Sequence, residues 1–211
     1  MKSSLGNALA VMLLVTTTAA GQTLSERPAK AFGNSANSYQ PITGRQRLHW
    51  FTRSTIGPES LTAGLFTAGF GTSTNRPREY GPHWEGFGQR YGMRFTGIAT
   101  GNAIEASVGA LWGEDPRYFR AADQSLKGRI KNVVVMTFAA RQAEGNLAPA
   151  YARYIGIAGN NFLSNTWRAD SESGMGDACL RTALGFAGRM GRNAFAEFWP
   201  TITKHVFHKN R

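Results

Sequence analysis

The stretch HWEGFGQRYGMRFTGIATGNAIEASVGALW, residues 83–112, decides the fold class of this chain. Small residues recur along it at steps of three or four, and large residues form a second stripe with the same spacing. This period is typical of an α-helix, because a strand alternates every second residue. A stripe of small residues also lets a second helix backbone approach closely. We therefore predict a helix over 83–112 whose packing face includes Gly88, Gly92, Ala99, Ala103 and Ala106.

Four further segments have helical spacing, at about 59–70, 125–141, from 149 onward and at about 177–198. The last two again carry small residues at steps of three or four, which we expect at helix contacts: Gly156, Gly159, Ala187 and Gly191. The chain is therefore predicted to be all-α, a Gly/Ala-rich bundle of about five helices that occupies residues 57–211 as a single domain.

Three asparagines lie beside small residues in three of these helices, namely Asn102, Asn160 and Asn193. Their amides either hydrogen-bond between helices and fix the helix register, or they lie on helix surfaces in water. Both interpretations stay open from the sequence.

The composition excludes several classes of protein. With 211 residues, 42% apolar and 18% charged, the chain is too hydrophobic for general disorder and too polar for a polytopic membrane protein. Its 25 glycines show no three-residue period, which excludes a collagen-like chain.

Residues 1–21 are predicted to be a cleaved secretory signal peptide. Lys2 precedes an apolar run over 8–15, and small residues at 18–21 fit a cleavage site. The run is too short to span a bilayer comfortably. The alternative is an uncleaved amphipathic or membrane-anchoring start. We expect an exported protein of the periplasm or outer envelope of a bacterium.

Residues 22–56 are rich in Ser, Asn, Gln, Pro and Gly, and they are predicted to form a disordered or extended arm. The end of this arm interleaves cations with aromatic residues at Arg45, Arg47, Trp50 and Arg53. These residues either form a strip that binds a surface, or the aromatic rings hold the arm against the folded body.

The net charge of +11 favours an anionic partner. Most of the basic residues are Arg, which makes bidentate contacts with phosphate or carboxylate. In an exported protein we expect an anionic membrane or envelope surface rather than nucleic acid, although the charge could simply keep the protein soluble. A homo-oligomer stays open. The candidate binding residues in the body are Arg90, Arg94, Arg117 and Arg120.

The sequence carries few signs of catalysis. It contains no complete nucleophile elbow, no HExxH metal motif and no GxGxxG, so no metal or cofactor is predicted. His205 and His208 are two ligands at a basic C-terminus, a poor metal site. The single Cys179 is interpreted as a buried small apolar residue rather than a reactive thiol.

The weak catalytic candidates are His83, Glu105 and Asp115. Glu105 is the single acid over 95–113, so it is either buried with a cation such as Arg94 or exposed to water. A buried acid with a raised pKa could transfer protons. The favoured alternative is an arginine-paired carboxylate that locks helices together, because nothing nearby supplies a nucleophile.

Three motifs resemble those of a family of small exported bacterial proteins of unknown function. They are YG at 80–81 with GFGQRYG at 86–92, EDPRYF at 114–119 and EFWP at 197–200. The resemblance covers about 57–200 and implies export and a glycine-rich helical body, with no activity that can be carried over.

These observations favour an exported, non-enzymatic envelope protein, membrane-associated or structural, with an Arg-rich surface for anionic partners. One alternative is an envelope hydrolase or lyase that uses a buried carboxylate. A second is an outer-membrane β-barrel, which conflicts with the helical spacing.

Overall fold

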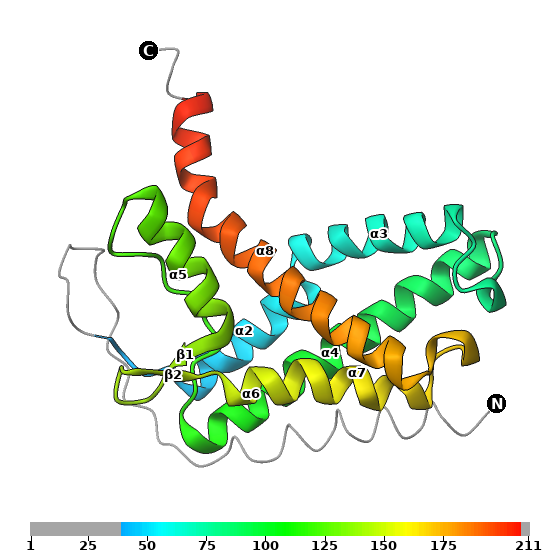
Figure 1. Ribbon diagram of the computed structural model, residues 1–211, viewed down its shortest axis with the longest axis horizontal. Coiled ribbons are helices and arrows are strands. Elements are labelled where there is room, and N and C mark those ends of the chain that lie inside the picture. Colours follow the sequence, from blue (N-terminus) through cyan, green and yellow to red (C-terminus); the bar gives the residue numbers. More distant parts are fainter. Residues whose placement is uncertain (1–38, 208–211) are drawn as a thin grey trace.

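The computed structural model of the chain describes residues 39–207, with side chains to residue 203, and the predicted signal peptide and residues 22–38 of the predicted arm lie outside this range. The described part is all-α, as predicted. Figure 1 shows its helices: α2 (Gly44–Ile56), α3 (Pro58–Ser73), α4 (Trp84–Trp112), α5 (Leu126–Phe138), α6 (Tyr151–Tyr154), α7 (Asn160–Leu163) and α8 (Met175–Phe207).

Short elements connect these helices. The π-helical turn η2 (Ile155–Gly159) joins α6 to α7, so that residues 151–163 form one continuous helical segment. An antiparallel hairpin of β1 (Ala139–Arg141) and β2 (Leu147–Pro149) precedes it. The remaining turns are 3-10 helices: η1 (Arg78–Tyr80), η3 (Ser164–Thr166) and η4 (Asp170–Glu172).

Helix α4 is the centre of the packing. It contacts α2, α3 and the segment from α6 to α7, whereas α8 packs on α5, η2 and α7. Figure 1 shows α8 running diagonally across the molecule and α3 lying alongside the first half of α4. Helix α4 begins one residue after its predicted start and ends at Gly113, which has the left-handed conformation (φ 78°).

The prediction of an extended arm is wrong for residues 44–56, which form α2. Thr43 and Gln46 make a capping box, in which the Thr43 hydroxyl accepts from the Gln46 amide (3.3 Å) and the Gln46 side chain accepts from the Thr43 amide (3.1 Å). The helix packs through polar side chains instead of an apolar stripe. Asn102 donates to the Thr55 hydroxyl over 3.1 Å, and Arg47 reaches the Ala106 carbonyl at 3.5 Å.

Two other helix ends differ from their expected positions. Helix α5 ends at Phe138 rather than 141, because residues 139–141 pair with β2. Helix α8 continues past Pro200 to Phe207. A proline leaves the carbonyl four residues earlier without its helical donor. Arg120 supplies the missing donor, since its Nε hydrogen-bonds the Ala196 carbonyl at 3.0 Å.

The predicted small-residue face is correct in the second half of α4 and wrong in the first. Ala99, Ala106 and Gly156 are buried, and Ala103 and Gly159 are half-buried. The other predicted packing residues are exposed, namely Gly88, Gly92, Ala187 and Gly191. The first half of α4 turns its larger side chains toward α3, where a Cβ at Gly64 would lie 2.7 Å from the Tyr91 ring. The small stripe therefore points away from α3.

Candidate functional site

The interior of the protein is charged rather than apolar. Its buried apolar side chains are alanines together with Val133 and Met136. The largest fully buried side chains are Arg153, Glu114, Thr137, Asp115, Pro116 and Ser164. Because an isolated buried charge is very costly, each of these charged groups needs partners nearby.

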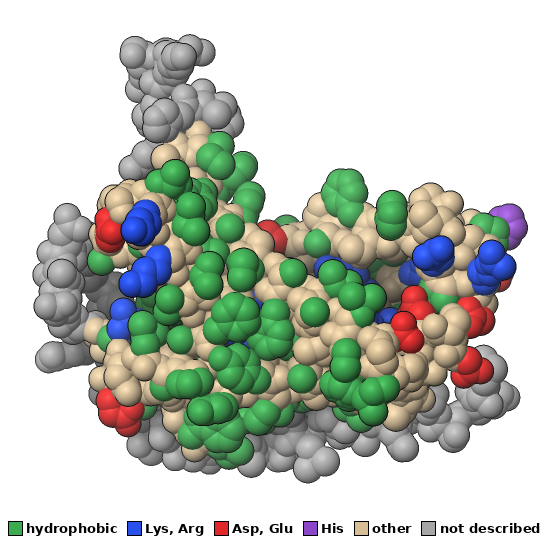
Figure 2. Space-filling view, viewed as in Figure 1, with side chains coloured by type: hydrophobic (Ala, Val, Ile, Leu, Met, Phe, Trp, Pro, Cys, Tyr) green, Lys and Arg blue, Asp and Glu red, His purple; other side chains and the backbone are tan. Residues whose placement is uncertain are grey.

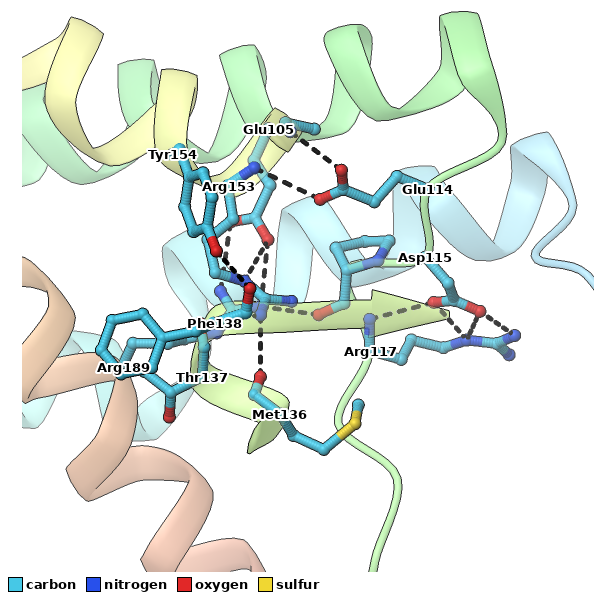
Figure 3. Close-up of polar contacts among 12 residues, drawn as sticks. Glu105, Glu114, Asp115, Arg117, Met136, Thr137, Phe138, Arg153, Tyr154 and Arg189 are labelled. Atoms are coloured by element: carbon cyan, nitrogen blue, oxygen red, sulfur yellow. Dashed lines mark hydrogen bonds and ion pairs between the residues drawn. The ribbon is translucent and has the colours of Figure 1, made fainter. Parts of the chain in front are cut away.

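At the centre of this interior, Glu105 of α4 is held by two arginines (Figure 3). Arg153 Nε donates to Glu105 Oε1 over 3.1 Å, and Arg189 donates to Oε1 and Oε2 over 3.0 and 3.1 Å. The side chain of Glu105 is 4% exposed, that of Arg153 is 1% exposed and that of Arg189 is 6% exposed. The ion cluster therefore connects α4, α6 and α8.

The remaining donors of the two arginines go to backbone carbonyls. Arg153 Nη1 donates to the carbonyls of Met136 (2.7 Å), Thr137 (3.1 Å) and Ala139 (3.2 Å), where α5 ends and β1 begins. Arg189 Nη2 donates to the Pro116 carbonyl over 2.7 Å. The Arg153 bonds tie the end of α5 to the cluster (Figure 3), and the Arg189 bond ties the α4–α5 connection to it.

Glu114 supplies the first turn of α6 with hydrogen-bond acceptors. Its carboxylate accepts from the backbone amides of Ala152 (2.9 Å) and Arg153 (3.3 Å). Helix α6 has no side-chain cap of its own. A carboxylate is favourable at a helix N-terminus, where backbone amides lack partners within the helix.

Asp115 forms a second ion pair beside the cluster. Arg117 Nη2 lies 2.6 Å from Asp115 Oδ2, and the Tyr39 hydroxyl donates to the same oxygen over 3.1 Å. Burial, together with the negative charge of Asp115 and this hydrogen bond, raises the pKa of Tyr39 to about 12. Residues 114–117 thus form a buried, arginine-clamped junction.

A third cluster surrounds Glu197 of α8. Its carboxylate accepts from the Tyr118 hydroxyl (2.6 Å), the Ala121 amide (3.2 Å) and Arg129 Nε (3.1 Å), and Arg129 also donates to the Glu197 carbonyl. Burial, followed by the hydrogen bond to Glu197, raises the pKa of Tyr118. Glu114 and Glu197 both belong to the motifs singled out in the sequence.

The alternative of a buried acid with a raised pKa does not fit Glu105. Burial alone would raise its pKa, but the positive charges of Arg189, Arg153 and Arg192 outweigh burial and hold the pKa of this carboxyl below its ordinary value. Glu105 is therefore ionised at neutral pH and carries no proton to donate. The interpretation as an arginine-paired lock fits this geometry, with Arg153 and Arg189 in place of the expected Arg94.

The three catalytic candidates do not form one site. Asp115 is fully buried and held by Arg117, whereas His83 is exposed at the N-cap of α4. Since a helix rises 1.5 Å per residue, His83 lies about 33 Å from Glu105 along α4.

The predicted binding arginines fall into two groups. Arg45, Arg53 and Arg120 are exposed. The others turn inward, because Arg47 and Arg90 are buried and Arg94 and Arg117 are half-buried. Trp50 is also half-buried, with the Arg189 guanidinium 5.8 Å from its ring centre. This position fits the interpretation in which aromatic rings hold residues 44–56 against the body.

Arg90 is an inward arginine that is held by the backbone. Its guanidinium donates to the backbone carbonyls of Arg76 (2.7 Å), Pro77 (2.8 Å) and Gly81 (2.8 Å). These bonds fix the connection between α3 and α4. The sequence analysis missed Arg129, Arg153 and Arg189 altogether.

A large cavity lies above the central ion cluster. Its volume is about 1510 Å³, and its walls come from α2, α3, α4, α8 and the segment from α6 to α7. Glu105 and Arg189 form part of the wall, together with Arg94, Arg192 and Asn160. Figure 2 shows a hollow between α3 and α8 in which basic side chains are visible.

Other features of the described residues bear on function. Over residues 39–203, where side chains are described, no cluster of three or more His, Cys, Asp or Glu side chains could hold a metal ion. Within residues 39–207, no helix combines the length and the apolar character needed to cross a membrane. Cys179 is exposed, so its interpretation as a buried residue is wrong. Helix α8 turns this position outward.

The fold and the site define an all-α protein with a charged, arginine-rich interior and a large cavity whose wall includes several arginines. Comparison with known protein families, with curated proteins and with solved structures finds no match to this chain.

Proposed function

We propose that this chain is an exported, non-enzymatic protein of the bacterial cell envelope that associates with an anionic membrane surface. The observation that supports this proposal is the reversed distribution of polarity, with ion pairs inside and large apolar side chains outside. Soluble proteins rarely expose large contiguous apolar surfaces, and such surfaces mark sites of contact with lipid or with other proteins.

The exposed apolar residues are large and numerous. Phe66 and Phe70 of α3 are 75% and 73% exposed, and Trp84 and Leu111 at the two ends of α4 are 82% and 81% exposed. Others lie along α5, α6 and α8, including Ile130, Phe138, Tyr151, Leu184 and Trp199. Figure 2 shows hydrophobic side chains spread over the face formed by α5, α6 and α8, with charged side chains toward its two ends.

This distribution favours lipid over a single protein partner. A protein partner covers one patch, whereas here apolar side chains project from most of the long helices. The net charge of +11 adds attraction to anionic headgroups, and Arg45, Arg53 and Arg120 are exposed for this contact. The lowered pKa of Glu105 and the clamped Asp115 give no support to the alternative of a hydrolase or lyase.

Co-sedimentation with lipid vesicles tests the proposal. The chain should bind vesicles that contain phosphatidylglycerol more tightly than vesicles of phosphatidylcholine, and the difference should shrink as salt is raised. The double variant Phe66→Ser/Phe70→Ser should bind at least tenfold more weakly, because burial of each phenylalanine contributes about 1.5–3 kcal/mol. The control Thr62→Ser changes a polar exposed position of the same helix and should bind like wild type. Protein that stays in the supernatant with both vesicle types would overturn the proposal.

A further inference from the structure

The cavity wall is rich in arginine, and several of these arginines already have partners. Arg90 donates to three backbone carbonyls, Arg117 pairs with Asp115, and Arg189 pairs with Glu105. Arg168 pairs with Glu172 over 3.2 Å. A ligand can be bound by the guanidinium groups whose N–H donors do not already hydrogen-bond the protein.

Arg94 and Arg192 are two such groups, and both are half-buried. Arg94 makes one hydrogen bond within the described residues, from Nη1 to the Ser60 carbonyl over 3.0 Å. Arg192 makes no hydrogen bond or ion pair within them, although its charge interacts with those of Glu105 and Glu59. Glu59 and Ser60 are neighbours in the first turn of α3, and both line the same cavity as Arg94 and Arg192.

Burial lowers the pKa of both arginines. A guanidinium group has five N–H donors and no acceptor, so most of the donors of Arg94 and Arg192 have no protein partner among the described residues. Donors and a positive charge partly removed from water are stabilised by an anion that accepts their hydrogen bonds.

A polar group in the wall from a different helix is also without a partner. Asn160 of α7 lines the cavity, and its carboxamide oxygen is buried with no hydrogen-bond partner in the described part of the chain. The Nδ2 atom of the same side chain lies 3.6 Å from the position that a Cβ at Gly97 would take, which places the carboxamide against α4. A buried acceptor without a donor costs about 1–3 kcal/mol, so a hydroxyl group there is favourable.

We infer that this cavity binds a phosphate-bearing ligand, with Arg94 and Arg192 on the phosphate and the Asn160 carboxamide oxygen on a hydroxyl of the same ligand. Arginine matches phosphate because its planar fork donates two parallel hydrogen bonds. The cavity volume of about 1510 Å³ exceeds what a small phosphate ester fills, so the ligand has room for a longer substituent. The phosphate belongs either to a free phosphate ester or to a lipid headgroup.

Isothermal titration calorimetry of the full chain with glycerol 3-phosphate at pH 8 tests this inference. Wild type should bind, and Arg94→Gln and Arg192→Gln should each weaken affinity about tenfold or more, the effect expected for a lost charge-assisted hydrogen bond. The control Arg78→Gln removes the same charge from an exposed residue of η1 outside this cavity and should stay within twofold of wild type. Arg192→Lys keeps the charge but loses the fork, and its affinity should lie between wild type and Arg192→Gln.

Asn160→Ala separates the hydroxyl contact from the phosphate contact. This variant should weaken binding of glycerol 3-phosphate and leave binding of methyl phosphate, which has no hydroxyl, within twofold of wild type. Circular dichroism and thermal melting of each variant show whether it is folded. If Arg192→Gln does not fold, Arg192→Lys and Arg94→Gln carry the test.

Vesicles of phosphatidylglycerol distinguish the two sources of phosphate. If the lipid headgroup occupies the cavity, glycerol 3-phosphate should compete with the capture of protein by vesicles, and Arg94→Gln should reduce that capture. If the ligand is a free ester, neither glycerol 3-phosphate nor Arg94→Gln should affect capture. Both results support the inference. Absence of binding to glycerol 3-phosphate, or equal weakening by Arg78→Gln, overturns it. Retained titration without vesicle capture would overturn only the proposed function, because Phe66 and Phe70, which the vesicle test removes, do not line the cavity.

Discussion

Arg153 Nε lies 3.1 Å from Glu105 Oε1, and both side chains are almost fully removed from solvent. The two residues are 48 positions apart in the chain, on α6 and α4. Removing two charges from water costs several kcal/mol each, and only close geometry with satisfied hydrogen bonds offsets that cost. Arg189 completes the arrangement from α8, so one carboxylate joins three helices. The helix arrangement therefore depends on this carboxylate.

Glu105→Gln should destabilise the protein strongly. The substitution keeps the size of the side chain but leaves Arg153 and Arg189 buried without their counter-charge. Breaking a buried pair in this way costs about 3–5 kcal/mol. Urea denaturation followed by circular dichroism measures the loss.

The control for this variant is Glu172→Gln, which breaks the half-buried pair with Arg168 at 3.2 Å. Pairs of this i,i+4 type contribute about 0.3–0.5 kcal/mol. Equal losses for the two variants would mean that the Glu105 cluster does not hold the helices together.

Stability should fall in acid through the same carboxylate. Because the folded protein holds the pKa of Glu105 below its ordinary value of 4.5, the ionised form favours the folded state. This contribution is present above about pH 4.5 and is lost as the pH falls further and Glu105 takes up a proton. Urea denaturation at pH 6, 4.5 and 3.5 should show a loss for wild type below pH 4.5 that is smaller in Glu105→Gln. Parallel curves would rule out Glu105 as the titrating group.

The helical periods predicted the main helices, but not the polar contacts between them. Residues three or four apart show which side of α4 Glu105 occupies, yet they say nothing about which helix lies opposite. The sequence offers Arg94 as one example of a cation that could pair with Glu105, whereas the tertiary fold brings Arg153 and Arg189.

Helix α2 shows a different limit. Its stretch has no sustained apolar period, since it packs through buried Arg47 and Thr55. A signal for this helix was nevertheless present, because Thr43 followed three residues later by Gln46 fits a capping box. The exposed apolar residues could not be predicted for a different reason. A stripe of large residues predicts a buried face, and in this chain many such residues point outward.

Alkaline pH should weaken the junction at Asp115. Burial and the charge of Asp115 raise the pKa of Tyr39 from 10.0 to about 12, so the folded state favours the protonated hydroxyl. The resulting contribution to stability is complete below pH 10 and is lost as the pH rises through 12. Absorbance at 295 nm, which follows tyrosine ionisation, should show less late-titrating signal in Tyr39→Phe than in wild type. An unchanged signal near pH 12 would show that Tyr39 titrates normally.

Two glycine substitutions should have opposite effects, because only one glycine lies at a close helix contact. A Cβ at Gly156 would lie 2.9 Å from the Gly101 carbonyl oxygen and 3.1 Å from Glu105 Cβ, so Gly156→Ala forces η2 away from α4. Overpacking of this kind costs about 1–3 kcal/mol. At Gly92, nothing lies within 4 Å of the added Cβ, and Gly92→Ala should stabilise the exposed helix by up to about 1 kcal/mol. Thermal melts should therefore place Gly156→Ala below wild type and Gly92→Ala at or above it. The reverse order would mean that α4 packs through its exposed stripe rather than against η2.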